Sequence, residues 1–426
     1  MHRKFVIVLI PIQLWCMAVI GACAYAQAPN SDTLKVNIKQ VEEQFLKNNL
    51  TLIAQKYNID NASAQIITAR LFPNPDFNFQ NGILNDTHDA YKNQSVGISQ
   101  LFTTAGKRNK NIQLAKIGVE QAKDQFFDLI RTLKFTLRTD FYTIYYNQQS
   151  AKVYDQEIGS LSKTLTAFKE QYAKGNIAQK EVLRIQSQLY SLQAEYNGLV
   201  TDIDTTQSEL KMLIKASPNS YIVPVVDADL NSKESVTSIP YGKLLDSAYV
   251  NRYDLKNARA TVDYNNMNLQ LQKATAVPDV NLSLGYDKYG SFNNNYVGGG
   301  IEFNLPFFNR NQGGIKQARI AIDQSKVQLE NQQNQIAMDL ATSYKGALRL
   351  EKLYNSFDPA FKGDFTHLIQ EVYKNYQLRN ISLLEFIDFY DSFKTNTIQL
   401  NSIQLSKITS LEQLNYVTGT PFFNQQ

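Results

Sequence analysis

The chain carries the same pattern twice, and this duplication restricts the folds that it can adopt. Residues 112–123 (IQLAKIGVEQAK) and 315–326 (IKQARIAIDQSK) align without a gap, and five of the twelve pairs are identical. The same offset of 203 relates Pro75-Asp76 to Pro278-Asp279. A register held over this distance indicates two copies of one structural unit, and any predicted fold must accommodate both.

The two predicted repeats span residues 38–215 and 241–419. Between them, the segment 216–240 contains three prolines and a stretch rich in Ser, Asn and Asp. This composition predicts a linker or a small irregular subdomain. Each repeat opens with a helical pattern about 30 residues long, at 38–71 and 241–274.

A pair of strands follows in each repeat. Residues 76–80 (DFNFQ) and 279–286 (DVNLSLGY) alternate between apolar and polar side chains. The chain then passes a polar tip (85–93 and 288–295) and returns through 96–98 and 301–305. Strict alternation predicts a sheet with one apolar and one polar face.

After the strands, each repeat is helical over a great length. No proline occurs between Pro75 and Pro218, and apolar residues recur there in steps of three and four. The spacing predicts a helix over 107–172, about 100 Å long at 1.5 Å per residue. After a break at Gly175, a heptad seam continues. One chain has too few apolar residues to bury such helices in a globule, so they are expected to pack side by side as coiled coils.

The first 26 residues are predicted to be a signal peptide. A short basic start (His2-Arg3-Lys4) precedes an apolar run, and Ala24-Tyr25-Ala26 fits a cleavage site. The alternative is a lipidation signal, with Cys23 carrying the lipid. Beyond residue 26 no stretch approaches the about 20 apolar residues of a membrane-spanning helix, so entry into a membrane would require a β-barrel.

The sequence offers no pattern for catalysis or for a cofactor. Its two cysteines, Cys16 and Cys23, lie in the predicted leader, and only His88 and His367 follow it. No metalloprotease, nucleotide-binding or hydrolase motif is present. A formal net charge of +4 in 426 residues gives no electrostatic reason to expect nucleic acid as a partner. We therefore expect no enzyme, no cofactor and no metal site.

Over residues 38 to 419 the chain resembles the TolC family of outer-membrane efflux proteins. The carriers are the two matching elements 172–181 (YAKGNIAQKE) and 376–385 (YQLRNISLLE), the Pro-Asp strand starts, Leu305-Pro306-Phe307 before a long helix, and Val417-Thr418-Gly419. Each motif alone is weak, but their repeated order is specific.

The resemblance implies an α+β fold in which three chains form a 12-stranded outer-membrane β-barrel, four strands from each. The barrel would continue into a long α-helical coiled-coil barrel in the periplasm. The expected partners are two further copies of the chain, outer-membrane lipid, a periplasmic adaptor (membrane fusion) protein and an inner-membrane pump of the RND type. The implied function is a passive exit duct for efflux or type I secretion, with a link to the heavy-metal cation subgroup. Four amphipathic strands cannot close a barrel alone, which favours the trimer independently.

The resemblance also assigns roles to residues near the two helical turns. Glu181, Glu385 and Asp388 would ring the periplasmic mouth of the tunnel, where carboxylates favour cations. Residues that an adaptor would contact are Tyr172, Gly175, Asn176, Ile177, Tyr376, Arg379, Asn380 and Ile381. The alternatives are exposed helix carboxylates near a helix N-terminus and side chains that merely pack in the coiled coil.

Some positions depart from the family pattern. Arg379 stands where the second turn is expected to have a glycine, and Lys215 where the first repeat ends with one. Asp358-Pro359 interrupts the second long helix, because proline ends or kinks helices. A different class of function also stays open, an exported coiled-coil structural or adhesive surface protein without a pore. The matched alternating strands argue against it, since a coiled coil does not need them.

Overall fold

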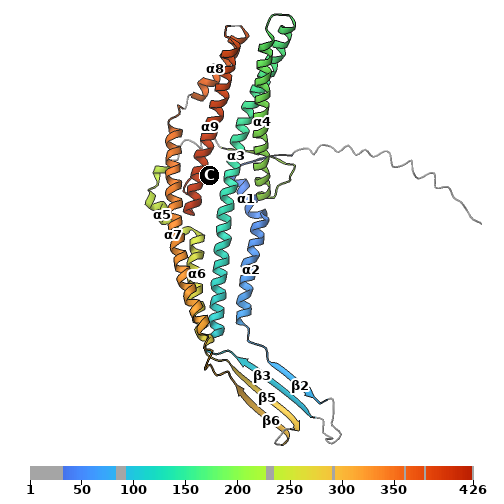
Figure 1. Ribbon diagram of the computed structural model, residues 1–426, viewed down its shortest axis with the longest axis vertical. Helices are drawn as coiled ribbons and strands as arrows, with labels where there is room; N and C mark the ends of the chain where they lie inside the picture. Colours follow the sequence, from blue (N-terminus) through green and yellow to red (C-terminus); the bar gives the residue numbers. More distant parts are fainter. Residues whose placement is uncertain are drawn as a thin grey trace, which may run out of the picture.

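The computed structural model describes residues 32–82, 93–226, 235–289, 293–358, 361–378 and 380–424. The predicted signal peptide with Cys23, His88 in the first strand tip, Pro359 and Arg379 lie outside these ranges. The described chain is elongated, with strands at one end and two helical hairpins at the other (Figure 1). No described helix combines the length and apolarity that crossing a membrane would require.

The first long helix is present as predicted. Helix α3 runs over Lys107–Ala173, 67 residues. It ends in a tight turn at Gly175, whose φ of +77° is a left-handed conformation that favours glycine. Helix α4 (Gln179–Ile214) then returns along α3. The apolar seam explains the pairing, because Leu161, Leu189 and Leu192 are buried in it.

The expected single helix over 38–71 is wrong, because the structure has two helices there. Helix α1 (Ile38–Asn48) and helix α2 (Leu50–Arg70) meet at Asn49, whose backbone is extended. The Asn49 side chain accepts a hydrogen bond from the Leu52 N–H (2.9 Å) and donates one to the Leu213 carbonyl (2.9 Å). A single buried amide thus caps one helix and ties it to α4.

The second repeat follows the same order with one difference. Helices α5 (Tyr241–Asn251) and α6 (Tyr253–Thr275) also replace a predicted single helix, with the break at Arg252, 203 residues after Asn49. The long helix is divided into α7 (Gln312–Asn355) and α8 (Phe361–Gln377), which agrees with the interruption predicted at Asp358-Pro359. Helix α9 (Leu383–Thr418) returns as α4 does.

The strands form one antiparallel sheet in the order β2-β3-β5-β6. They span Asp76–Asn81, Gln94–Phe102, Val280–Tyr289 and Asn294–Glu302. The predicted return strand over 301–305 was placed too late, since β6 ends at Glu302. The predicted polar tip over 288–295 was too long, since both strands extend into it. Glycines in β6 (Gly298, Gly299 and Gly300) obscured the alternation there.

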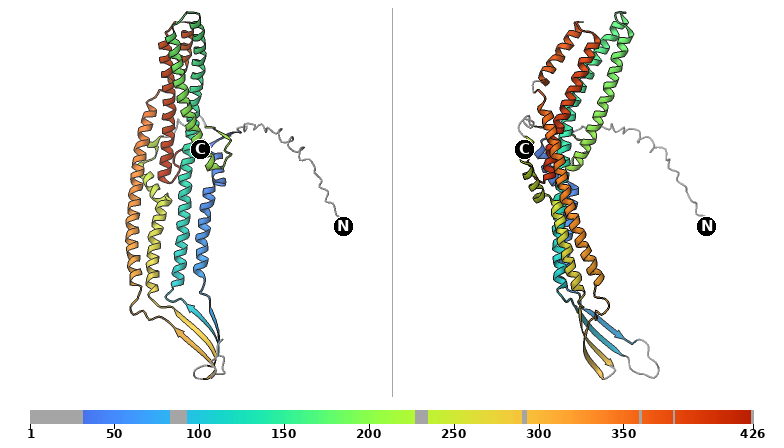
Figure 2. Two further views of the ribbon diagram at one scale, coloured as in Figure 1. Left: turned by 45° about the vertical axis from the view of Figure 1, so that its right-hand side comes forward. Right: turned by 60° about the vertical axis from the view of Figure 1, so that its left-hand side comes forward.

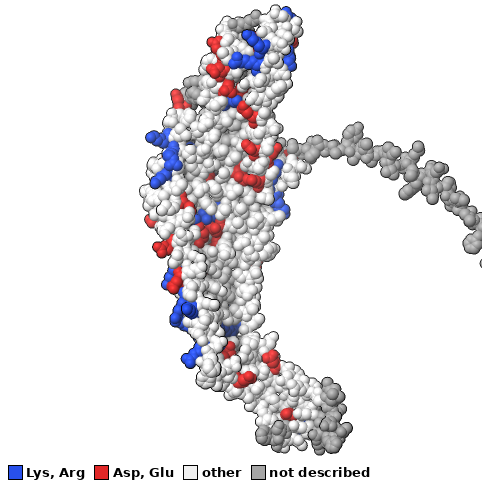
Figure 3. Space-filling model, in the orientation of Figure 1, with Lys and Arg blue, Asp and Glu red and all other residues white. Residues whose placement is uncertain are grey.

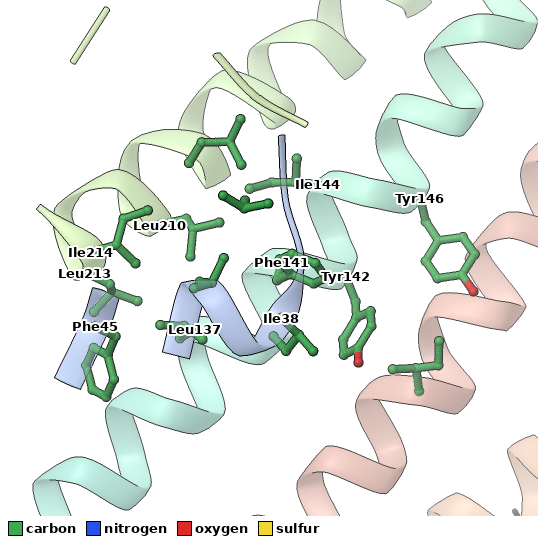
Figure 4. Close-up of a cluster of buried hydrophobic side chains, with 14 of the residues drawn as sticks. Ile38, Phe45, Leu137, Phe141, Tyr142, Ile144, Tyr146, Leu210, Leu213 and Ile214 are labelled. Atoms are coloured by element: carbon green, nitrogen blue, oxygen red, sulfur yellow. The ribbon is translucent and has the colours of Figure 1, made fainter. Parts of the chain in front are cut away.

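A second, small sheet lies half-way along the molecule. Strand β1 (Thr33–Val36) pairs in parallel with β4 (Tyr221–Pro224). Strand β4 lies in the segment that was expected to be a linker or a small irregular subdomain. A short 3-10 helix (Val236–Ser238) follows. We call this region, with α1, α5 and residues 419–424, the belt. Its core joins α1, α3 and α4, with Leu137, Phe141 and Ile144 less than 2% exposed (Figure 4).

The left-handed helix ends match between the repeats. Lys215 closes α4 with φ +55°, and Gly419 closes α9 with φ +68°. The position therefore keeps its backbone geometry although a lysine stands where a glycine is expected. Two views of the ribbon show how the helices continue from the belt in both directions (Figure 2).

Candidate functional site

The four-stranded sheet has one apolar and one polar face. The strand register places Phe79, Val96, Tyr286 and Val297 in one row across all four strands. Because side chains alternate along a strand, the same face also holds Phe77, Ile98, Leu282, Leu284 and Ile301. The opposite face holds Asp76, Asn78, Gln80, Ser95, Ser99, Asn281, Ser283, Asp287 and Glu302. Leu101, Tyr289 and Tyr296 are exceptions on this polar face, and Gln100 and Lys288 are exceptions on the apolar one.

This apolar face is uncovered in the single chain. Phe77 is 70% exposed and Val297 is 72% exposed. No Lys or Arg is visible over the strands in the view of Figure 3, where the charged atoms are acidic. An uncovered apolar face that extends over four strands is expected of a surface that meets lipid or another chain. A polar face on the other side suits contact with water.

Both edges of the sheet are open. Within the described chain β2 pairs only with β3, and β6 pairs only with β5. Unpaired N–H and C=O groups along an edge strand favour pairing with a further strand. The sheet therefore has the properties of a segment of a larger barrel.

At the opposite end, the first helical turn is held by a compact set of hydrogen bonds. The Gly175 N–H donates to the Tyr172 carbonyl (2.9 Å), and the Asn176 N–H donates to the Gln171 carbonyl (2.9 Å). The Asn176 side-chain amide also donates to Gln171 Oε1 (2.7 Å). Tyr172 is 44% exposed, whereas Ile177 packs on the apolar core of the hairpins.

The second turn repeats this arrangement. The Asn380 N–H donates to the Asn375 carbonyl (2.9 Å), and its side-chain amide donates to Asn375 Oδ1 (3.1 Å). Tyr376 stacks on Phe386 with ring centroids 4.2 Å apart, and Ile381 packs beside them. Of the predicted tip residues, Ile177, Tyr376 and Ile381 therefore contribute to the core, while Tyr172, Gly175, Asn176 and Asn380 are exposed.

The three predicted gate acids lie close to these turns. Glu385 is exposed and forms a capping box with Ser382, whose N–H and hydroxyl both donate to Glu385 Oε2 (2.8 and 2.7 Å). These bonds lower the pKa of Glu385. Asp388 is exposed one turn further on, and Glu181 is half-buried in the first turn of α4. The pKa of the Tyr376 hydroxyl is raised, mainly by burial and to a smaller extent by the nearby charge of Glu181.

Several groups of buried charge lie between the ends of the molecule, among them one around Arg138 and one around Lys394, and no sequence pattern indicated them. In the belt, Arg138 of α3 lies 2.6 Å from Glu42 of α1 and 2.7 Å from Glu412 of α9. Its remaining nitrogen donates to the Asn424 carbonyl (2.9 Å). One guanidinium thus joins both repeats and the C-terminal residues. The only signal in the sequence was an arginine between the apolar Leu137 and Phe141.

The second group lies among α3, α4 and α9, nearer the turns. Lys394 lies 3.0 Å from both Glu195 and Asp391. Glu157 is 4% exposed, and its Oε2 has no hydrogen-bond partner among the described residues. Burial raises the pKa of Glu157 to about 7, although the charge of Lys394 opposes this.

The described residues contain no group of three or more His, Cys, Asp or Glu side chains that could hold a metal ion. His367, the one described histidine, is exposed on α8.

Comparisons with known proteins agree with this architecture. The chain is 22% identical over 291 residues to the cobalt-zinc-cadmium resistance protein CzcC of Cupriavidus metallidurans, covering 68% of this chain and 67% of that one. It is 22% identical over 286 residues to the nickel-cobalt-cadmium resistance protein NccC of Alcaligenes xylosoxydans, covering 65% and 63%. The chain thus spans about two thirds of the length of these relatives.

Among solved structures, the Campylobacter jejuni outer membrane channel CmeC superposes with a TM-score of 0.72 at 14% identity. The match covers 91% of this chain and 87% of that one, which shows the fold. The sequence model of the family described as outer membrane efflux protein matches residues 41–214 and 244–354, more than half of the chain. The chain therefore belongs to the outer membrane efflux protein family, and it is an outer-membrane exit duct for efflux rather than a coiled-coil adhesin without a pore.

Proposed function

We propose that the protein works as a homotrimer in which each copy gives four strands to a 12-stranded barrel in the outer membrane. The two-faced sheet supports this, because its apolar face would meet lipid and its polar face would line water. Three copies would also pair every open strand edge, which a single copy cannot do. The long helices would then form a tunnel through the periplasm.

The cargo that we propose is divalent transition-metal cations. The names of the relatives CzcC and NccC, which refer to cobalt, zinc, cadmium and nickel resistance, carry this proposal. The exposed carboxylates Glu385 and Asp388 add a second reason. They stand three residues apart near the second turn, so they share one helix side. In a trimer, they and Glu181 would place nine carboxylates at the mouth, which favours cations over anions.

The helical turns lie at the end of the molecule opposite the strands (Figure 1), where partner proteins in the periplasm would contact it. An exit duct has no energy source of its own, so an inner-membrane pump of the RND type would drive transport through a periplasmic adaptor. The exposed residues Tyr172, Gly175, Asn176 and Asn380 would contact the adaptor at the tips. Arg379 is proposed for the same contact from its place in the sequence alone.

Deletion of the gene tests the cargo. The growth of the deletion strain would be measured in graded zinc, cobalt and cadmium, with complementation by the intact chain. We expect a lower inhibitory concentration for these metals, restored by the intact chain, and no change for an anionic toxicant such as arsenate. Unchanged metal tolerance together with a new sensitivity to organic drugs would contradict the metal proposal.

A further inference from the structure

The two repeats of one chain touch each other at the junction between strands and helices. Lys107, the first residue of α3, places its ammonium 2.7 Å from the carboxylate of Asp279, which stands just before β5. The Thr104 N–H also donates to Asp279 Oδ1 (2.8 Å), and its hydroxyl donates to the Pro278 carbonyl (2.6 Å). These contacts fix the segment that follows β3 in the first repeat to the segment that precedes β5 in the second repeat.

The repeats also touch further along the helices. On α3, the Gln121 side chain donates to the Thr261 hydroxyl of α6 (3.0 Å), and Phe127 stacks on Tyr253 with centroids 4.9 Å apart. Ile117 lies on the same side of α3 as Gln121, one turn away, and is half-buried. These contacts define the face that the first repeat presents to the second.

The repeat offset of 203 identifies the counterparts of these residues. Lys107 corresponds to Arg310, and Asp279 corresponds to Asp76. Both counterparts are exposed, and neither has an ion pair among the described residues. Arg310 stands two residues before α7 begins, whereas Lys107 is the first residue of α3, a difference that the longer arginine side chain can span.

The helical contact has counterparts too. Gln121 corresponds to Gln324 on α7, and Thr261 corresponds to Asn58 on α2. Both are exposed, and a glutamine and an asparagine can hydrogen-bond to each other. Ile320, the counterpart of half-buried Ile117, is 57% exposed.

Apolar surface surrounds both of these exposed positions, although the Asn58 side-chain amide also donates to Gln55 Oε1 of its own helix (2.8 Å). Val327 lies on the same side of α7 as Ile320 and Gln324 and is 66% exposed. On α2, Leu50 is 59% exposed and Tyr57 is 66% exposed, and they share one side with Asn58. Within one copy α6 packs between α3 and α7, whereas the main neighbour of α2 is α3 alone. One side of α2 and one side of α7 therefore lack the neighbour that the pattern of the repeats supplies elsewhere.

We propose that neighbouring copies join by repeating the contact between the two halves of one chain. The face formed by α7 and β6 of one copy then packs on α2 and β2 of the next, with Arg310 paired to Asp76 and Gln324 bonded to Asn58. The assignment rests on the proposed trimer and names the residues that hold it together. It also closes the barrel, because β6 and β2 are the two open edges of the sheet.

Double-cysteine variants test these pairs, since the only natural cysteines precede residue 27. The variants are Asp76→Cys with Arg310→Cys, and Asn58→Cys with Gln324→Cys. Outer membranes from cells that express each variant are treated with a short bis-maleimide, which spans thiols too far apart for a disulfide. We expect a shift of the denatured protein to two and three times the single-chain mass.

The matched controls are the equivalent pairs inside one chain. Lys107→Cys with Asp279→Cys, and Gln121→Cys with Thr261→Cys, are expected to link within one chain and leave the mass unchanged. The residue assignment is overturned if the two variants designed to link neighbouring copies stay at single-chain mass while the native protein in detergent has the mass of three chains. That result would not contradict the trimer. A native protein with the mass of one chain overturns the trimer itself.

A charge reversal gives an independent readout. Asp76→Lys or Arg310→Glu alone should lower the temperature at which the oligomer band disappears on a gel, because each creates a like-charge pair. The combination of both should restore it. A double variant that is no more heat-resistant than the worse single variant would contradict the pairing.

Discussion

The belt and the helical hairpins near the turns both bury charge, but they do so differently. In the belt Arg138 meets two carboxylates and a carbonyl, and the more deeply buried carboxylate, Glu412, also accepts a hydrogen bond from Asn424 (2.9 Å). In the hairpins Glu157 is as deeply buried as Glu412, yet one of its oxygens has no partner among the described residues. A buried charge is stable only when its partners replace water.

This difference assigns different properties to the two regions. The belt is built to hold α1, α3, α9 and the C-terminal residues in one arrangement over a wide pH range. The hairpins contain a carboxyl group whose charge depends on pH near neutrality. We therefore expect substitutions in the belt to be costly at every pH, and those around Glu157 to act in a narrow pH window.

The largest effect is expected from Arg138→Met. It leaves Glu412 buried without its cation, which costs about 3–5 kcal/mol in comparable buried pairs. Urea unfolding of the detergent-extracted protein measures the change in free energy. Arg349→Met is the matched control, because Arg349 is exposed on α7 and should change stability by less than about 0.5 kcal/mol. Equal effects of the two variants would show that the belt network is not needed for stability.

A smaller effect, with a defined pH dependence, is expected from Glu157→Gln. The pKa of Glu157 is raised from 4.5 in the unfolded chain to about 7 in the folded one. The folded protein therefore binds this proton more tightly, and stability is lost as the pH rises from 4.5 to 7. Glutamine removes that loss, so the variant should be more stable than the native protein at pH 8, by up to about 3 kcal/mol.

At pH 5 the difference should shrink to about 1 kcal/mol or less, because only a small part of the loss has occurred at that pH. Thermal unfolding at the two pH values measures both predictions, with Glu120→Gln on the exposed side of α3 as the control that changes neither. The charged groups facing Glu157 are Lys394 and Asp391 on α9 and Glu195 on α4. If Glu157→Gln changed stability equally at pH 5 and pH 8, Glu157 would have to be ionised and paired with a cation at both pH values.

The smallest effect is expected from Lys394→Met. Its partners Glu195 and Asp391 have side chains 43% and 52% exposed, so both remain hydrated when the ammonium is removed. The loss at pH 5 should be about 1 kcal/mol or less, because removal of the ammonium leaves only hydrated carboxylates without a partner. The variant should also extend the pH range over which Glu157 stays protonated, because the charge of Lys394 opposes the rise of its pKa. A loss as large as that of Arg138→Met would remove the distinction between the regions.

The sequence was sufficient for those features that repeat along the chain. The long helix over 107–172 follows from a proline-free periodic stretch, and β2 and β5 follow from strict alternation. The glycines of β6 obscured its alternation, so its bounds were predicted wrongly. Features set by a single long-range contact were not predictable. The breaks at Asn49 and Arg252 involve contacts with residues that are distant in the sequence, Leu213 and Asp339 respectively. The pairing of β1 with β4 depends on contact across 188 residues, as Thr33 lies opposite Tyr221.

The positions of the predicted site residues were predictable to different degrees for the same reason. The turns and their acids follow from a local motif that occurs twice, so their positions near the ends of the hairpins were predictable. Whether a side chain at a turn points outward depends on its neighbours from the other hairpin. Tyr376 illustrates this, since stacking on Phe386 and Phe168 places in the core a residue that the motif alone would put at a contact surface.

The conductance of the purified protein in a planar lipid bilayer tests the central claim most directly. With a salt gradient across the bilayer, we expect open channels whose reversal potential shows preference for cations. Replacing Glu385→Gln and Asp388→Asn together should weaken that preference and any block by divalent cations, whereas Glu43→Gln in the belt should change neither. Absence of conductance would contradict the channel, and unchanged selectivity and block in the double variant would show that these carboxylates do not line its mouth.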